Sequence, residues 1–404
     1  MTWQSLSAAV WPQRGPHPLA GQTILQIVPV LGADGTEQII EIAEALASVG
    51  ARPLVASAGG RLVPELQAKG GLWLPFPAQT KNPLAMALNK RKLAHLIWRE
   101  RVTLVHARSR APAWVAYGAT RRPRIAFVTT YHAGYSGGGV FKLNYNAVMA
   151  KGDIVIANSA FTAQHIASLY PAVSGRVRVV ARGIDFRVFA PQDVDAARVL
   201  ALRNAWNVGS DERIVLLPAR LVAHKGHKVL IEAARLLTSA GLRGVKFILA
   251  GDEQGRGAYV RELDAAIAKA GLEGIVRRTG HCADMPAALL AATVAVIPAT
   301  EPETFSRVTA EAQAMGTPVV VSDLGGLAEI VAAPPQVAIA ERTGWRVPPG
   351  DARALAAAVY DVLMLGASAR EAMSLRARTQ VLGRYSVARM QAETLAAYAE
   401  LIGR

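Results

Sequence analysis

The sequence predicts an α/β protein with parallel sheets, organised as two domains. Short apolar runs alternate with helix-compatible stretches along nearly the whole chain, which is the pattern of successive βα units. About half of the residues are apolar, which suits parallel sheets buried under helices on both faces. At 404 residues the chain is long for one domain and comfortable for two.

Five strands are expected in the first half of the chain. The first of them runs into the sequence LGADG, where Gly32 allows a close approach of the backbone before a helix begins. This loop lacks the GxGxxG spacing, so it does not indicate a dinucleotide site. The expected strands cover residues 23–31, 52–58, 102–107, 125–131 and 153–159.

Residues 86–101 are predicted to form a basic helix. Leu93, Leu96 and Ile97 recur at helical spacing. One interpretation is a solvent-facing helix whose Lys and Arg stems cover apolar surface. The other is a helix that lies on an anionic membrane, with Trp98 at the interface. The basic residues of this segment are Lys90, Arg91, Lys92, Arg99 and Arg101.

The positive charge of the chain is concentrated in its first half. The formal net charge is +15, and residues 1–190 hold 21 Lys and Arg against 8 Asp and Glu. Residues 191–404 hold 24 against 22. This asymmetry favours an anionic partner: an acidic membrane surface, an acidic substrate or nucleic acid. The basic residues are not interleaved with stacking aromatic residues and no nucleic-acid reading motif is present, which argues against nucleic acid.

Three features bear on the compartment. The single cysteine, Cys282, cannot form an internal disulfide and fits a reducing compartment. The first residues lack the basic start and apolar core of a signal peptide. No run reaches the roughly 18 consecutive apolar residues that a membrane-spanning helix needs. We therefore expect a soluble or peripheral protein.

Two strand ends in the first half carry candidate binding residues. The sequence VHARSR places His106, Arg108 and Arg110 at the carboxyl end of a strand, where open α/β sheets bind ligands. The two arginines could bind a carboxylate or phosphate with forked hydrogen bonds, or they could cap or cross-link loops. His132 follows the next strand and is a further candidate, although a lone histidine is more often structural.

The second half opens with a strand followed by positive charges. The strand RIVLLPA delivers Arg220, and Lys225 with Gly226 begins a helix after a short loop. Two positive charges beside a helix N-terminus suit a diphosphate, because Coulomb attraction and backbone amide donors act together. His281 and Cys282 do not predict a metal site, since no further cysteine or matching histidine accompanies them.

Residues 298–329 combine a strand, a polar turn, a helix and a second strand that leads to the pair Gly325-Gly326. The N-terminus of a helix binds anions through its unpaired amides. Glu303 precedes the helix and Glu311 lies within it, so both could bind hydroxyl groups of the same ligand. The alternative interpretation is an ordinary βαβ crossover with glutamates on its surface.

Glu303, seven residues, Glu311, then AMGTPVVVS and GGxxE together resemble the donor-site signature of retaining family 4 glycosyltransferases. The resemblance implies the GT-B architecture, in which two Rossmann-like domains face each other across a cleft and the last helix returns to the first domain. The implied parts are an acceptor-binding domain at 1–188, a nucleotide-sugar-binding domain at 189–382 and a C-terminal helix at 383–404.

The resemblance also implies the roles of individual residues. The donor's diphosphate would be held by Arg220 and Lys225, its sugar by Glu303, and a sugar hydroxyl near the reacting carbon by His132; these four are the catalytic candidates. The acceptor candidates are His106, Arg108 and Arg110. The donor nucleotide would be contacted by Gly32, Gly251, Thr304, Phe305, Ser306 and Glu311.

The combination of HARSRAPAW, TTYH and KLNYNAVMAKGDIVIANS looks closest to a narrower group, the mannosyltransferase-like enzymes of lipopolysaccharide core assembly in alphaproteobacteria. This likeness implies retaining transfer of a mannose- or glucose-type hexose from a GDP- or UDP-linked donor to a lipid-linked or core glycan. The reaction would take place on the inner face of the cytoplasmic membrane, with no metal or other cofactor. The rivals are a sugar-nucleotide epimerase or a phosphorylase with the same fold, and a non-catalytic protein that binds anionic membrane or nucleic acid.

Overall fold

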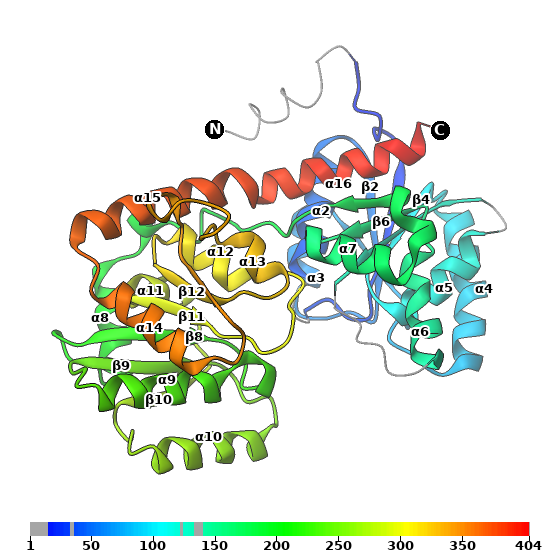
Figure 1. Cartoon of the computed structure of the whole chain (residues 1–404). Coiled ribbons are helices and arrows are strands. Elements are labelled where there is room, and N and C mark those ends of the chain that lie inside the picture. Colours follow the sequence, from blue (N-terminus) through cyan, green and yellow to red (C-terminus); the bar gives the residue numbers. More distant parts are fainter. Residues whose placement is uncertain (1–14, 33–35, 122–123, 133–139, 404) are drawn as a thin grey trace. The chain divides into compact units, whose positions relative to one another are not determined.

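The computed structural model of the chain describes residues 15–32, 36–121, 124–132 and 140–403 (Figure 1). It contains two compact units, each built around its own parallel sheet. The N-terminal unit comprises the chain up to Gly183 together with Val387–Arg404, and the C-terminal unit comprises Ile184–Ser386. The α/β fold with two Rossmann-like sheets and a last helix that returns to the first unit is thereby confirmed.

The N-terminal unit holds a seven-stranded parallel sheet in the order β3-β2-β1-β4-β5-β6-β7. The order reverses between β1 and β4, and ligands of open α/β sheets bind at such a switch point, beyond the carboxyl ends of the strands. The strands are β1 (Thr23–Ile27), β2 (Arg52–Ser57), β3 (Leu72–Pro75), β4 (Leu104–Ala107), β5 (Ala126–Tyr131), β6 (Ile154–Ala157) and β7 (Val177–Val179).

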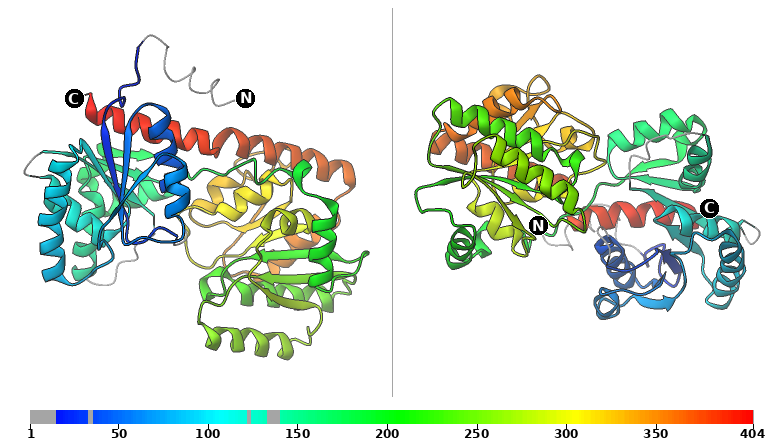
Figure 2. Two further views of the ribbon diagram at one scale, coloured as in Figure 1. Left: turned by 180° about the vertical axis from the view of Figure 1, so that it is seen from behind. Right: turned by 90° about the horizontal axis from the view of Figure 1, so that it is seen from below.

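Helices cover both faces of this sheet, as the views in Figure 2 show. On one face, Leu25 and Val105 pack with the apolar sides of α4 and α5; on the other, Ile24 and Leu104 pack with α2 and α16. The helices are α2 (Glu37–Ser48), α3 (Val63–Ala68), α4 (Pro83–Arg99), α5 (Arg110–Thr120), α6 (Val140–Asn146), α7 (Ala160–Leu169) and α16 (Val387–Ile402), with 3-10 turns η1 (Ala147–Ala150) and η2 (Pro171–Arg176).

The C-terminal unit has the same architecture, with a six-stranded parallel sheet in the order β10-β9-β8-β11-β12-β13. Its switch point therefore lies between β8 and β11. The strands are β8 (Arg213–Pro218), β9 (Val245–Ala250), β10 (Val276–Gly280), β11 (Val294–Ile297), β12 (Val319–Ser322) and β13 (Trp345–Val347).

The largest apolar cluster of this unit lies where α9, α10 and α14 pack on the sheet. The helices are α8 (Ala196–Ala205), α9 (His227–Ser239), α10 (Gly257–Lys269), α11 (Met285–Ala291), α12 (Arg307–Ala314), α13 (Gly326–Ile330), α14 (Ala352–Leu363) and α15 (Ala367–Arg384). The 3-10 turns are η3 (Pro191–Asp193), η4 (Ala223–Lys225) and η5 (Ile339–Glu341).

Helix α16 is an integral part of the N-terminal unit, although it comes last in the chain. Its Tyr398 is fully buried, and the Gln391 side chain donates a hydrogen bond to the carbonyl of Glu41 on α2. Arg178 of β7 forms a two-point ion pair with Glu400.

Among the described residues, no single helix is long and apolar enough to span a membrane. Only the pair α14 and α15, which is bent by 111°, reaches that length and hydropathy when the two helices are taken together.

Candidate functional site

The loops after β8 and β11 meet at the switch point of the C-terminal sheet. The chain leaves β8 through Arg220, whose side chain is exposed, and turns through η4 into α9. The amide of Thr300, in the loop after β11, donates to the carbonyl of His224 in η4 over 2.9 Å. Segments about 75 residues apart thus form one wall, because their strands are neighbours in the sheet.

Lys225 and Glu303 are in direct contact at this wall. Lys225 Nζ lies 2.7 Å from Glu303 Oε1, and the two side chains are only 18% and 15% exposed. The structure therefore brings together two of the four predicted catalytic residues. A positive group and a hydroxyl-binding carboxylate side by side can serve the phosphate and the sugar of one ligand.

Two glycines allow the backbone packing behind this pair. Gly226 has φ of +75°, and a Cβ there would lie 1.8 Å from the carbonyl oxygen of Pro298. A Cβ on Gly326 would lie 2.3 Å from the carbonyl oxygen of Thr304, and its amide donates to the carbonyl of Glu303 over 2.7 Å. Gly326, the second residue of the Gly325-Gly326 pair, thus packs directly against the backbone of the Glu303 loop.

Gly251, predicted to contact the donor nucleotide, has a packing role of the same kind. A Cβ at this position would lie 1.8 Å from the carbonyl oxygen of Ala219, so the residue lets the loop after β9 pass directly beside the loop after β8. The amide of Leu221 donates to the carbonyl of Asp252 there. Gly251 therefore lies next to Arg220 and shapes the surface on which that side chain stands.

The segment between β11 and α12 carries the remaining predicted donor residues. Thr304, Phe305 and Ser306 are buried, and Ser306 is the N-cap residue of α12. The ring of Phe305 packs edge-on against Tyr385, with 5.4 Å between centroids. This apolar anchoring of Phe305 fixes the direction of α12 and of the amides at its N-terminus.

Glu311 lies within α12 and is largely buried. Its carboxylate forms an i, i+4 ion pair with Arg307, with Arg307 Nε 3.3 Å from Glu311 Oε1. The pair sits in the helix that begins directly after the Glu303 loop. The joint binding of one ligand by Glu303 and Glu311 stays a prediction.

The switch point of the N-terminal sheet holds Gly32 after β1 and Arg108 after β4. Gly32 has φ of +125°, and its amide donates to the hydroxyl of Thr36 over 2.9 Å. Gly35, the second glycine of this loop, lies outside the described residues. Arg108 is buried: its Nε donates to Gln26 Oε1 over 3.2 Å, and burial lowers the pKa of the guanidinium.

Arg110, at the start of α5, is half-buried. Its Nη1 donates to Asn146 Oδ1 over 2.8 Å, and the guanidinium lies over the ring of Tyr145 at 5.5 Å. Two residues at the end of α6, Tyr145 and Asn146, therefore position the Arg110 side chain close to the surface. Arg108 points inward instead, so the two arginines do not form a common fork.

His106 does not have the placement of an acceptor ligand. Its ring is fully buried on the α2 and α16 face of the sheet. Nδ1 is 2.6 Å from the hydroxyl of Tyr398, and Nε2 is 2.6 Å from the hydroxyl of Thr130. Both ring nitrogens are engaged and burial lowers the pKa well below its usual value, so His106 is a neutral structural residue here.

His132 follows β5 and lies on the same side of the sheet as His106 and Arg108. Its side chain is half-buried by exposed area. Burial, and then the positive charges of Arg108 and Arg182, hold the pKa of His132 well below its usual value. A neutral imidazole can both donate and accept a hydrogen bond, which suits contact with a hydroxyl group. Arg182, which follows β7, was not singled out from the sequence.

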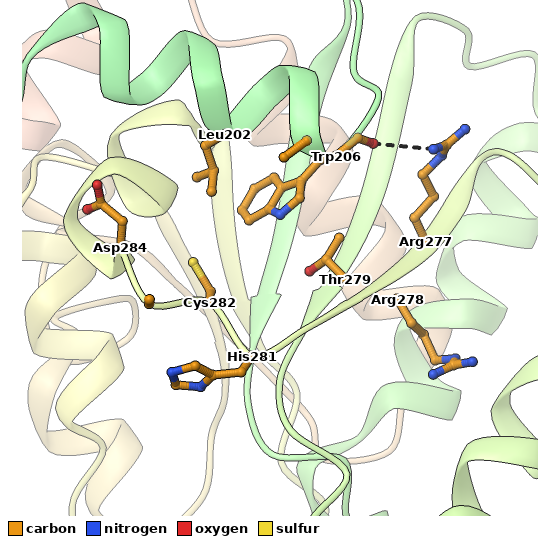
Figure 3. Close-up of a pocket in the computed structure, with 10 residues that line it drawn as sticks. Leu202, Trp206, Arg277, Arg278, Thr279, His281, Cys282 and Asp284 are labelled. Atoms are coloured by element: carbon orange, nitrogen blue, oxygen red, sulfur yellow. Dashed lines mark hydrogen bonds between the residues drawn. The ribbon is translucent and has the colours of Figure 1, made fainter.

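The loop after β10, residues 281–284, borders a cavity of about 620 Å³ in the C-terminal unit (Figure 3). The cavity lies between α8 and the edge strand β10, with Leu202 and Trp206 on one side and Thr279 and Cys282 on the other. Arg277 Nη1 donates to the carbonyl of Trp206 at its rim. No pattern in the sequence indicates that α8 lines this cavity. Within the described ranges, no group of three or more His, Cys, Asp or Glu is placed to bind a metal.

Comparison with known proteins agrees with this geometry. Residues 35–188 match the family described as Glycosyltransferase Family 4, and residues 200–380 match Glycosyl transferases group 1. A glycosyltransferase from Rickettsia africae ESF-5 of known crystal structure is 31% identical, with a TM-score of 0.85 over 94% of this chain and 98% of that one. This chain belongs to the group 1 glycosyltransferases.

Two further relatives of this glycosyltransferase match at lower identity or over less of the chain. The D-inositol 3-phosphate glycosyltransferase of Xylanimonas cellulosilytica is 33% identical over 187 residues, which is 46% of this chain and 44% of that protein. The alignment thus spans less than half of this curated relative. Anabaena HepE in complex with UDP-glucose has a TM-score of 0.78 at 23% identity, covering 94% of this chain and 99% of that one, and shows the shared fold.

Proposed function

We propose that this glycosyltransferase moves a mannose- or glucose-type hexose from a nucleotide sugar to a glycan acceptor with retention of the anomeric configuration. The observation that carries the proposal is the Lys225–Glu303 pair, 2.7 Å apart, in the wall that also contains the N-terminus of α12. In the reaction the bond between the anomeric carbon and the diphosphate oxygen breaks and leaves its electron pair on the diphosphate. A bond from the anomeric carbon to the acceptor oxygen forms, and the proton of the acceptor hydroxyl passes to the departing diphosphate.

The proposed roles follow from where charge develops. The leaving nucleoside diphosphate gains negative charge, which Lys225, Arg220 and the amides at the start of α12 would stabilise. Glu303 would then bind the donor sugar and Glu311 the ribose. This arrangement supplies positive charge without a metal ion, so we expect activity to persist in the presence of a chelator.

The residues of the N-terminal unit would serve the transferred sugar and the acceptor. The half-buried, neutral His132 would exchange hydrogen bonds with a sugar hydroxyl, and Arg110 would bind an anionic group of the acceptor. Burial, and then the charges of Arg108 and Arg182, would keep His132 neutral for this role. Among the curated relatives is an enzyme named for D-inositol 3-phosphate, which supports an acceptor that carries phosphate.

We propose a lipid-linked or lipopolysaccharide-core glycan as the acceptor, and therefore a reaction at the inner face of the cytoplasmic membrane. The support is the excess of positive charge in residues 1–190 together with the narrower sequence likeness described above. The donor base is GDP or UDP in this proposal. The fold neighbour HepE binds UDP-glucose, which supports a uridine donor, whereas the narrower likeness favours guanosine.

A thermal-shift panel with GDP, UDP, ADP and their sugar conjugates tests the donor site. A ligand present at about 100 times its Kd stabilises the native state by roughly 2.7 kcal/mol. We expect one nucleotide series to raise Tm in the wild type and not in Lys225→Ala. The matched control is Lys228→Ala, because Lys228, three residues further on in α9, is exposed and pairs with Glu262 at the surface. A shift that survives in Lys225→Ala, or the absence of any shift in the wild type, would overturn the assignment.

A product assay separates transferase from epimerase. The transferase reaction releases nucleoside diphosphate in step with glycosylated acceptor, whereas an epimerase converts one nucleotide sugar into another and releases none. An NMR time course of the first product anomer tests retention. Appearance of the inverted anomer first would exclude the retaining mechanism.

A further inference from the structure

The outer face of α4 exposes large apolar side chains in a regular row. Leu84, Leu88 and Trp98 are 80%, 57% and 75% exposed. Arg91 and His95 lie between them at the same helical spacing, so the five residues form one stripe along the helix. We call this row the α4 stripe. Isolated exposed apolar residues are ordinary on protein surfaces, whereas three large ones on the same face of one helix are a candidate contact surface.

The opposite face of α4 already supplies the packing that the helix needs. Leu93, Leu96 and Ile97 are buried against the sheet, and Asn89 Nδ2 donates to the carbonyl of Pro77. The aliphatic part of Lys90 lies against Gly118 of α5, so this lysine covers apolar surface. The α4 stripe is therefore not required for the fold of the N-terminal unit.

Positive charge surrounds the α4 stripe. Pro83–Arg99 contains no aspartate or glutamate, and Asn82 caps the helix with its side-chain oxygen. No ion pair involves Lys81, Arg91 or Lys92 among the residues that the structure describes, and all three are exposed. Arg99 is the exception, because it pairs with the neighbouring Glu100.

We propose that the α4 stripe docks on an anionic lipid surface, with the helix lying in the plane of the interface. Leucine side chains reach the acyl boundary, a tryptophan at the end of the row suits the headgroup level, and lysine and arginine on the flanks meet lipid phosphates. A nucleic acid would pair its phosphates with the basic residues, but it would not bury the exposed leucines. The inference rests on the proposed function, because it names the surface by which the enzyme would reach its membrane; the stripe itself contains none of the proposed donor or acceptor residues.

The docking is both electrostatic and apolar, which gives two separable variants. Each basic residue close to an anionic surface strengthens binding by about fivefold. We expect Arg91→Gln/Lys92→Gln to weaken binding to anionic vesicles at least tenfold. We expect Leu84→Ser/Leu88→Ser/Trp98→Ser to leave only weak binding that salt abolishes, since exposed charges are screened within about 8–10 Å at moderate ionic strength.

The experiment is co-sedimentation of the full chain with two kinds of vesicle: phosphatidylcholine alone, and phosphatidylcholine mixed with phosphatidylglycerol. The control variant Arg261→Gln/Lys269→Gln removes the same charge from the exposed side of α10 and is expected to bind like the wild type. Every variant is checked for an unchanged nucleotide thermal shift, so loss of folding or of the donor site is recognised separately from loss of docking.

Three results would overturn the proposal. The first is equal binding of the wild type to neutral and anionic vesicles. The second is unchanged vesicle binding by both α4 variants. The third is a wild type that does not sediment with vesicles but binds a DNA or RNA oligonucleotide through Arg91 and Lys92, which would make the surface a nucleic-acid site.

Discussion

Replacing Lys225 by methionine removes the charge on which the proposed donor site depends. Lys225 and Glu303 are 2.7 Å apart and less than one-fifth exposed, so water screens their attraction only in part. A hydrogen bond between charged groups is worth about 1.5–3 kcal/mol, and deleting one partner leaves the other charge uncompensated. We therefore expect Lys225→Met and Glu303→Gln each to lower the free energy of unfolding by roughly that amount in the absence of donor.

The double variant reports the coupling between the two residues. Because the two single changes remove the same interaction, the double change should cost about 1.5–3 kcal/mol less than the sum of the single changes. The assay is urea unfolding of the four proteins, followed by initial rates of nucleoside diphosphate release. If Lys225 stabilises the leaving diphosphate to the same extent, kcat/KM of Lys225→Met falls roughly 10- to 150-fold.

Two outcomes would refute this reasoning. Additive costs in the double variant would mean that the pair contributes nothing to the native state. A value of kcat/KM within about twofold of the wild type for Lys225→Met would mean that Lys225 does not contact the diphosphate. Lys228→Met, three residues further on at the start of α9, should leave both readouts unchanged and so controls for a general loss of positive charge.

Two further predictions concern packing and pH. Gly326→Ala places a Cβ 2.3 Å from the carbonyl oxygen of Thr304 and should cost about 1–3 kcal/mol in urea unfolding, whereas Gly366→Ala, with no atom within 4 Å, should be nearly neutral. Burial lowers the pKa of His227 to about 4 in the folded state. Neutral His227 therefore contributes fully to the free energy of unfolding above the unfolded pKa of about 6.5. This contribution is lost as the pH falls towards 4. Between pH 7 and pH 5 this amounts to about 2 kcal/mol of unfolding free energy. His227→Gln should abolish that part of the pH dependence, and an unchanged pH dependence would contradict the prediction.

Most of the fold could be predicted because buried parallel strands are continuous apolar runs. Strands such as β2, β5 and β6 were expected at nearly the residues that form them. The two edge strands of the N-terminal sheet, β3 and β7, were not expected, because each has a neighbour on one side only and its residues are half exposed. Without a run of buried residues, an edge strand has no clear signal in the sequence.

The proposed donor wall could be anticipated because its residues follow the strands β8 and β11 within two short sequence motifs. His106, which was predicted to bind the acceptor but is buried, shows the limit of that reasoning. Strand side chains alternate between the two faces of a sheet, so a residue near the strand end points either toward a ligand or into the interior. What decides the direction here is Tyr398, 292 residues away, and no local pattern could reveal that partner.

That contact also sets an order of events during synthesis. The interior of the N-terminal unit is closed by Tyr398 and other buried residues of α16, which the ribosome produces only after the whole of Ile184–Ser386. At translation rates of about 5–20 residues per second, roughly 200 residues separate the two parts by about 10–40 s. During this interval the nascent N-terminal unit lacks its last helix, so α2 is present to cover the apolar face around Ile24 and Leu104 but α16 is not. The unit that is made first is therefore the one that is completed last.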